Sequence, residues 1–268
     1  MRTIAHLSDL HFGAVDPETV PEIVTAVAQA DPDLVVVSGD LTQRARARQF
    51  AAARAFLDQL PRPQIVVPGN HDVPLWNLLA RGFTPIEKYK RFIGPELEPF
   101  FADEEMAVLG LNTARAFTIQ GGRINRRQAE RVRAVFERSP EKAMRIVVTH
   151  HPFDDRRNVD RPNIVGRAAM AMRVFAIAGV DVVLSGHQHL ARAASSAIRY
   201  PGHRALLVQA GTATSFRQRG ETNSFNLLRV SGAKLAIDRL EWDPTAKQFT
   251  KASSVAFRET EEGWREVA

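Results

Sequence analysis

Five short clusters of polar residues stand at the ends of apolar stretches, and they contain six of the eight histidines. They are Asp9-Leu10-His11, Gly39-Asp40, Gly69-Asn70-His71-Asp72, His150-His151 and Gly186-His187-Gln188-His189. Imidazole and carboxylate ligands suit Fe, Mn, Zn and Co better than Ca. Two such metals, about 3.5–4 Å apart, can hold a phosphoryl group, activate a water and stabilise a leaving oxygen. The clusters therefore predict a hydrolase with a dinuclear metal centre.

Spacing inside the clusters indicates how the side chains converge. Asp9 and His11 are two residues apart, so on an extended segment both side chains point to the same side. The same holds for His187 and His189 if their turn is extended. A pair of metals needs a bridging anion, and the carboxylate of Asp40 is suitable. Glycine permits the unusual backbone angles of tight turns, and the glycines that directly precede a candidate ligand are Gly39, Gly69 and Gly186.

The first third of the chain alternates between strand and helix patterns. Strands are predicted over residues 4–7, 34–37 and 65–67, and helices over residues 17–30 and 43–60. This order predicts parallel strands with right-handed crossovers. Each polar cluster follows a predicted strand, and open α/β sheets bind ligands at that edge. Thr42 and Asn125 are candidate helix caps.

The rest of the chain continues the pattern and then changes. Helices are predicted over residues 85–92, 124–138 and 166–178, and strands over 106–111, 146–149 and 180–184. After residue 190, the stretches 191–200, 204–209, 223–230 and 235–242 suggest antiparallel strands that complete a second sheet. Residues 73–103 are rich in Pro, aromatic and charged residues and are predicted to form an insertion or lid. The clusters extend from residue 9 to residue 189, so we expect residues 1–268 to form a single domain.

Composition narrows the classes of protein. The net charge is +6, which attracts an anionic substrate, a membrane surface or nucleic acid. The arginines are dispersed without a tail or block, so we favour a solvated surface over a dedicated binding patch. The sequence has no cysteine, which excludes disulfides and thiolate ligands. Neither a transmembrane stretch nor a signal-peptide pattern is recognised, and we expect a cytoplasmic protein.

The joint pattern of the five clusters resembles the signature of the calcineurin-like metallophosphoesterase superfamily. The stretches Leu7-Ser8-Asp9-Leu10-His11, Thr149-His150-His151-Pro152 and Gly186-His187-x-His189 are most similar to its class III cyclic nucleotide phosphodiesterases. The resemblance covers roughly residues 3–230. It implies an α/β fold, a four-layer αββα sandwich of two mixed β-sheets flanked by helices, with the late strands in the second sheet. It also implies two metal ions, Fe and Mn with Zn or Co as alternatives, and suggests a homodimer.

The resemblance gives each candidate residue a role. The implied metal ligands are Asp9, His11 and His189 for one metal, Asn70, His150 and His187 for the other, and Asp40 as the bridge. His71 would stand beside the metals and, when protonated, serve as general acid for the leaving alkoxide. His151 is interpreted as lying behind the ligands or facing substrate. Asp72 either orients a neighbour or caps a turn.

The favoured function is hydrolysis of a cyclic nucleotide or another small phosphodiester by a metal-activated hydroxide that attacks phosphorus in line. Alternatives with the same metal centre are a nucleotide-lipid pyrophosphatase of the UDP-diacylglucosamine type, a nuclease and a phosphomonoesterase. The lipid alternative expects an apolar flap, which residues 73–103 could supply. The nuclease alternative expects an extended basic groove, so nucleic acid is not the favoured partner. A non-enzymatic scaffold is disfavoured because scaffolds of this fold tend to lose ligand residues, whereas this set is intact.

Overall fold

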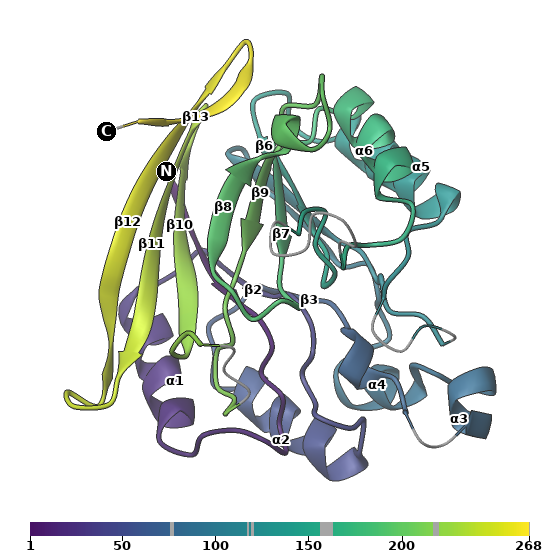
Figure 1. The fold of residues 1–268 in the computed structure, drawn as a ribbon, viewed down its shortest axis with the longest axis vertical. Coiled ribbons are helices and arrows are strands. Elements are labelled where there is room, and N and C mark those ends of the chain that lie inside the picture. The colour runs from purple at the N-terminus through teal and green to yellow at the C-terminus, as the bar shows by residue number, and fades with distance from the viewer. Residues whose placement is uncertain (76–77, 117, 119–120, 156–162, 217–219, 268) are drawn as a thin grey trace.

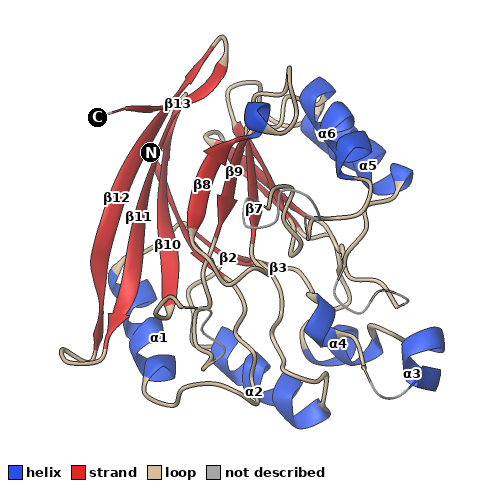
Figure 2. Ribbon diagram, in the orientation of Figure 1, coloured by secondary structure: helices blue, strands red, loops and turns tan. Residues whose placement is uncertain are grey.

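Two β-sheets face each other with helices on their outer sides (Figures 1 and 2). The computed structural model describes residues 1–75, 78–116, 118, 121–155, 163–216 and 220–267. The first sheet has the strand order β13-β12-β11-β10-β1-β2-β3, and the second has the order β4-β5-β6-β7-β9-β8. Both sheets contain parallel and antiparallel pairs. The expected α/β sandwich of two mixed sheets is therefore confirmed.

The first sheet joins the N-terminal strands to the C-terminal ones. Its strands are β1 (Arg2–Leu7), β2 (Leu34–Val37), β3 (Gln64–Val66), β10 (Ser224–Ser231), β11 (Lys234–Asp243), β12 (Gln248–Thr260) and β13 (Gly263–Val267). β1 pairs in parallel with β2 and antiparallel with β10. The expectation that the late strands complete the second sheet is therefore wrong for β10 and β11. Alternation of side chains identifies a strand, but it carries no information about which sheet edge the strand joins.

The second sheet has a parallel centre. Its strands are β4 (Phe100–Ala102), β5 (Met106–Gly110), β6 (Met144–Val148), β7 (Val182–Ser185), β8 (Arg192–Ser195) and β9 (Leu206–Gln209). β9 runs parallel to β7, whereas β8 pairs antiparallel with β9. Residues 204–209 were predicted to form an antiparallel strand. This prediction is wrong for the pairing of β9 with β7, which is parallel.

Helices cover the outer face of each sheet (Figure 2). α1 (Thr19–Gln29) and α2 (Ala47–Leu57) pack on the first sheet, and α5 (Arg126–Phe136) and α6 (Ala168–Ile177) pack on the second. The region of residues 73–103 contains α3 (Leu78–Phe83), α4 (Glu87–Phe92) and β4. Asn125 caps α5 by accepting a hydrogen bond from Gln128 N at 2.8 Å. Thr42 is not a helix cap, since α2 begins at Ala47.

Strand β2 shows why the central strands are apolar without interruption. Val36 packs between the sheets with Ile146 of β6, whereas Val35 packs under α2 with Phe50. Burial on both faces removes the usual alternation of polar and apolar residues. These strands hold the loops at their carboxyl ends in fixed positions. Among the described residues, no helix has the length and apolarity needed to cross a membrane.

Candidate metal centre

All five polar clusters leave the carboxyl ends of parallel strands and meet where the two sheets face each other. The clusters follow β1, β2 and β3 of the first sheet, and β6 and β7 of the second. Backbone hydrogen bonds fix the first two clusters together, because Asp9 N donates to Gly39 O at 3.0 Å and His11 N donates to Asp40 O at 2.9 Å. Across the sandwich, Nδ1 of His150 lies 2.8 Å from Ser38 O. The fold thus brings residues from both sheets to one point.

The first group of side chains consists of Asp9, His11 and His189. Nε2 of His189 lies 3.3 Å from Oδ1 of Asp9, and Nε2 of His11 lies 3.6 Å from the same oxygen. The two Nε2 atoms are 3.3 Å apart. All three residues are buried. Three donor atoms therefore converge on a space suited to one cation.

The second group consists of Asn70, His150 and His187. Nε2 of His150 lies 3.1 Å from Oδ1 of Asn70 and 3.3 Å from Nδ1 of His187. Asp40 stands between the groups: its Oδ2 atom is 3.8 Å from Nε2 of His11 and 3.4 Å from Nε2 of His150. All seven candidate ligands from the sequence are thus brought together, with Asp40 between the two groups.

The donors fit divalent metals. Oδ1 of Asp9 is fully buried and has no hydrogen-bond partner among the described residues, and such an orphaned oxygen is costly unless a cation satisfies it. Burial opposes ionisation of Asp9 and Asp40, but the facing histidines outweigh it and hold the pKa of both carboxyls well below the usual range. Burial and the charge of His150 lower the pKa of His187 to about 3, which leaves its imidazole neutral. Neutral imidazoles beside carboxylates are suitable ligands for Mn, Fe, Zn or Co.

His150 shows the strength of the local negative charge. Burial lowers its pKa, but the carboxylates of Asp40 and Asp9 and the carbonyl of Ser38 together outweigh burial and raise the pKa to about 9. A proton on His150 offsets the charge of Asp40, and a metal cation would provide the same neutralisation in its place.

Five of the candidate residues have a left-handed backbone. The φ angles are 54° at Asp9, 51° at His11, 54° at Asp40, 73° at His187 and 59° at His189. The expectation that Asp9 and His11 lie on an extended segment is therefore wrong. The turn that contains His187 and His189 is not extended either. Each such angle costs roughly 1–3 kcal/mol in a non-glycine residue. The surrounding contacts hold this strain in place and aim the side chains inward.

All three turn glycines lie where a side chain would come too close to a neighbour. A Cβ atom on Gly39 would lie 2.7 Å from Nδ1 of His150. A Cβ atom on Gly69 would lie 2.1 Å from Oδ1 of Asp40. A Cβ atom on Gly186 would lie 1.8 Å from Oγ of Ser8 and 2.5 Å from Oδ2 of Asp9. Of the three, Gly39 alone has a left-handed φ, of 95°. The expected reason, unusual backbone angles, thus applies to Gly39 only.

His71 lies beside the two groups and is half-buried. Its backbone N–H donates to Oδ1 of Asp40 at 2.8 Å, and its ring centroid is 4.9 Å from that of His11. Nδ1 of His71 lies 2.9 Å from Gln43 O. A carbonyl only accepts hydrogen bonds, so Nδ1 carries a proton.

Asp72 connects the loops after β2 and β3. It accepts hydrogen bonds from Leu41 N at 3.1 Å, from Thr42 N at 2.9 Å and from Gly69 N at 2.9 Å. Burial and the charge of Asp40 raise the pKa of Asp72 to about 6. Both roles considered for Asp72 agree with these contacts. It orients the neighbouring loop after β2, and its bond from Gly69 N caps the turn Asn70–Asp72.

Several residues that support the histidines were missed by sequence reasoning. Oγ1 of Thr212 lies 2.6 Å from Nδ1 of His189, and Nδ2 of Asn163 lies 3.0 Å from Nε2 of His187. Such contacts fix the orientation of an imidazole. Neither residue belongs to a motif, and both come from loops far along the chain from the residues that they touch. His151 was placed near the ligands, and its Nδ1 lies 2.8 Å from Oγ1 of Thr113.

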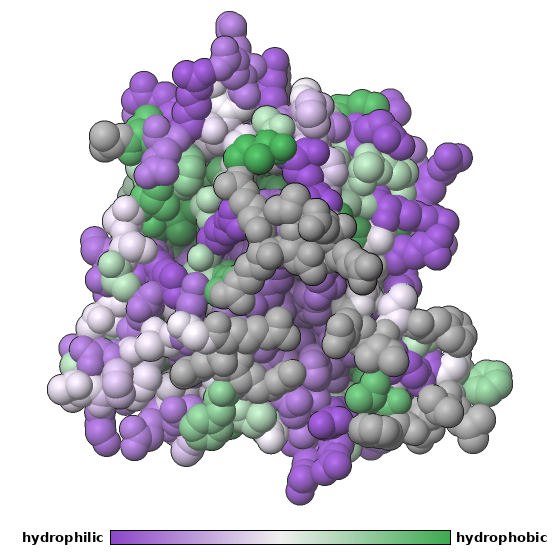
Figure 3. All heavy atoms as spheres, in the orientation of Figure 1, coloured by the Kyte–Doolittle hydropathy of each residue, from purple (hydrophilic) through white to green (hydrophobic). Residues whose placement is uncertain are grey.

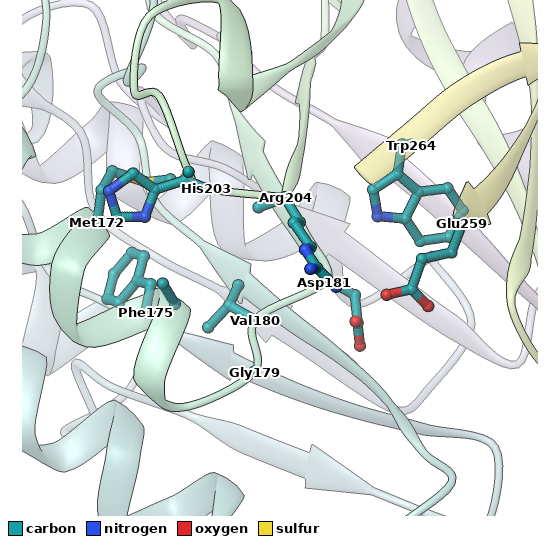
Figure 4. A pocket seen from close by; sticks show the side chains of 12 residues that line it. Met172, Phe175, Gly179, Val180, Asp181, His203, Arg204, Glu259 and Trp264 are labelled. Carbon is teal, nitrogen blue, oxygen red and sulfur yellow. The ribbon is translucent and has the colours of Figure 1, made fainter. Parts of the chain in front are cut away.

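A separate cavity of about 290 Å³ lies at the other end of β7. Figure 4 shows side chains along its wall, including Phe175, Asp181, Arg204 and Trp264. Asp181 directly precedes β7, whereas His187 follows it. None of the eight predicted site residues lines this cavity. It is therefore distinct from the candidate metal centre.

Comparison with known proteins agrees with this geometry. Residues 2–191 match the model of the calcineurin-like phosphoesterase family. A probable cyclic nucleotide phosphodiesterase from Synechococcus sp. is 27% identical over 208 residues, which cover 70% of this chain and 74% of that protein. A glycerophosphodiester phosphodiesterase from Enterobacter lignolyticus is 35% identical over 80 residues. That match covers 26% of this chain and only 29% of the relative.

The fold is also similar to that of solved structures. A dimetal phosphatase from Danio rerio superposes with a TM-score of 0.68 at 12% identity, over 97% of this chain and 99% of that one. At this level of identity the likeness concerns the arrangement of the two sheets and their helices.

Proposed function

The chain belongs to the calcineurin-like phosphoesterase family, and we propose that it is a phosphodiesterase that uses two metal ions to hydrolyse a small phosphodiester. The observation that carries the proposal is the position of Asp40 between two groups of donors. Oδ2 of Asp40 lies within 4 Å of Nε2 of His11 in one group and of Nε2 of His150 in the other. This is the arrangement that a pair of metals with one shared carboxylate requires.

The seven residues described above would hold the metals. When bound, the metals would neutralise charge on the phosphoryl oxygens and lower the pKa of an attacking water. The proposed metals are Fe and Mn. Zn and Co are kept as alternatives because the same ligands accept all four ions, and the availability of each metal rather than its affinity decides which is bound.

His71 is the proposed general acid. Its Nδ1–H is held by Gln43 O at 2.9 Å, so Nε2 is the atom that exchanges a proton with substrate. When protonated, Nε2 would donate its proton to the leaving alkoxide as the bond from phosphorus to the ester oxygen breaks. The contact between His71 N and Asp40 keeps this ring at a fixed place beside the metal centre.

A cyclic nucleotide or a glycerophosphodiester is the proposed class of substrate. Support comes from the two relatives, whose names specify these two kinds of diester. Hydrophilic residues cover much of the face in Figure 3, and the described apolar residues form small separate areas there. A homodimer and a cytoplasmic location stay predictions.

The proposal is tested by hydrolysis of bis(p-nitrophenyl) phosphate and p-nitrophenyl phosphate in parallel. The protein is stripped with a chelator, reloaded with Mn, Fe, Zn or Co, and compared with the Asp40→Ala variant. We expect metal-dependent cleavage of the diester that the variant lacks, and cleavage of cyclic AMP, cyclic GMP or a glycerophosphodiester. Cleavage of the monoester alone would make the protein a phosphatase instead.

A further inference from the structure

We infer that Arg81 is a positioning residue for substrate binding, because its side chain fastens together two segments that leave the metal centre. Arg81 lies in α3 and is 8% exposed. Its Nη1 donates to Pro74 O at 3.0 Å, and its Nη2 donates to Thr118 O at 2.9 Å. Its Nε donates to Ala116 O. One guanidinium thus joins the segment after β3 to the segment after β5.

Both segments begin at the proposed metal centre. Pro74 follows closely on the turn Asn70–Asp72, which contains a proposed ligand and the proposed acid. On the other side, Oγ1 of Thr113 lies 2.8 Å from Nδ1 of His151, whose ring centroid is 4.8 Å from that of His187. The separation between the two segments therefore helps to set the shape of the wall beside the metals.

The chemistry of the guanidinium suits this role. It presents N–H groups in a fixed planar fork, so a single side chain can reach several carbonyl oxygens at once. A buried cation is costly unless it is hydrogen-bonded. The three carbonyl contacts together offset the cost of burying the Arg81 guanidinium. Lysine has a point charge without the fork, and methionine has no donor.

This wall is expected to contact substrate rather than the metals. A phosphodiester has an ester group on each side of its phosphoryl group, and these groups extend to the surrounding protein when the phosphoryl group is at the metals. None of the carbonyls that Arg81 holds belongs to a proposed metal ligand. Loss of the clamp should therefore weaken substrate binding and leave the metals in place.

The experiment compares Arg81→Met and Arg81→Lys with the wild type, all loaded with the same metal. We expect the KM for bis(p-nitrophenyl) phosphate to rise roughly tenfold in Arg81→Met, at nearly unchanged kcat and metal content. The Lys variant should show a smaller increase. Added guanidinium chloride, at concentrations that do not unfold the protein, should lower the KM of an Arg81→Ala variant, because the short alanine side chain leaves space for the ion.

Arg131→Met is the matched control. Arg131 in α5 also bonds to the region of residues 73–103, through an ion pair with Glu98 at 3.1 Å, but its side chain is 45% exposed. Within the described part of the chain, it makes no hydrogen bond or ion pair with the clamped segments. Its KM should remain that of the wild type. The inference is overturned if KM is unchanged in both Arg81→Met and Arg81→Lys. It is also overturned if kcat, metal content and thermal stability fall together without rescue by guanidinium.

The inference rests on the proposed function, so a second readout separates the two. Hydrogen exchange reports the clamp without any substrate, and Arg81→Met should exchange faster in both α3 and the segment that begins at Thr113. If the wild type cleaves no diester, the proposed function fails while this result still supports the clamp. Unchanged exchange in both segments overturns the clamp whatever the activity.

Discussion

Nε2 of His189 lies 3.3 Å from Oδ1 of Asp9, although one residue follows β7 and the other follows β1. This contact joins the two sheets at the proposed metal centre. The His189→Gln variant should lose one of two metals, because it removes an imidazole ligand from the first group and leaves the second group intact. Elemental analysis after dialysis should give about one metal per chain instead of about two. Retention of both metals would mean that His189 is not a ligand.

The role of His71 predicts a dependence on the leaving group. The His71→Gln variant should retain most of its activity on p-nitrophenyl diesters, since p-nitrophenolate needs no protonation. On diesters with alkoxide leaving groups, kcat should fall by roughly 10²–10⁴-fold. Steady-state rates on the two kinds of substrate check this. An equal loss on both would assign His71 to binding rather than to proton transfer.

Gly186 is predicted to be intolerant of any side chain. The Gly186→Ala variant places a methyl group 1.8 Å from Oγ of Ser8 and 2.5 Å from Oδ2 of Asp9. We expect at least tenfold weaker metal binding and a loss of about 1–3 kcal/mol in the free energy of unfolding. Gly94→Ala is the control, since a Cβ atom there has no neighbour within 4 Å. Equal effects of the two substitutions would contradict the close-packing explanation.

Asp181 should make the protein less stable as pH rises. Burial, and after it the charge of Glu259, raises the pKa of Asp181 to about 6, whereas the hydrogen bond from Arg145 N opposes the shift. The folded state therefore binds this proton more tightly than the unfolded state, whose pKa is about 3.9. The stabilisation is complete below pH ~4 and is lost as the pH rises to about 6.

The Asp181→Asn variant removes this dependence and keeps an oxygen to accept from Arg145 N. At pH 7 it should be more stable than the wild type by about 2 kcal/mol in urea unfolding, and the gain should vanish near pH 4. Asp238→Asn should have the opposite sign. Burial opposes ionisation of Asp238, but Ser254 and Arg229 outweigh it and lower its pKa, so its charged form stabilises the folded state at neutral pH. A loss of stability in Asp181→Asn at pH 7 would contradict this account.

Sequence patterns located the ends of the strands better than the partners of the strands. The apolar run Leu34–Val37 forms β2 with the predicted bounds, because burial on both faces leaves an uninterrupted apolar stretch. The pairing of β10 with β1 could not be read in this way. It joins residues more than 200 positions apart, such as Arg2 and Val230, and depends on the whole arrangement of the sandwich.

The candidate site was predictable in its members but not in its geometry. Asp9 and His11 were identified by type and spacing, yet they converge through left-handed backbone angles rather than through an extended segment. Such angles depend on contacts from other loops, as when His187 N donates to Oδ2 of Asp9 at 2.9 Å. Supporting residues such as Thr212 leave no local signal, because their role depends entirely on the residue that they touch.

The most direct test of the central claim is the rate of diester hydrolysis as a function of bound metal. Chelator-treated protein is titrated with Mn while bis(p-nitrophenyl) phosphate hydrolysis and bound metal are measured on the same sample. A dinuclear centre bridged by Asp40 predicts that activity continues to rise until about two metals are bound per chain. Activity that saturates at one metal per chain, or that survives in Asp40→Ala, would contradict it.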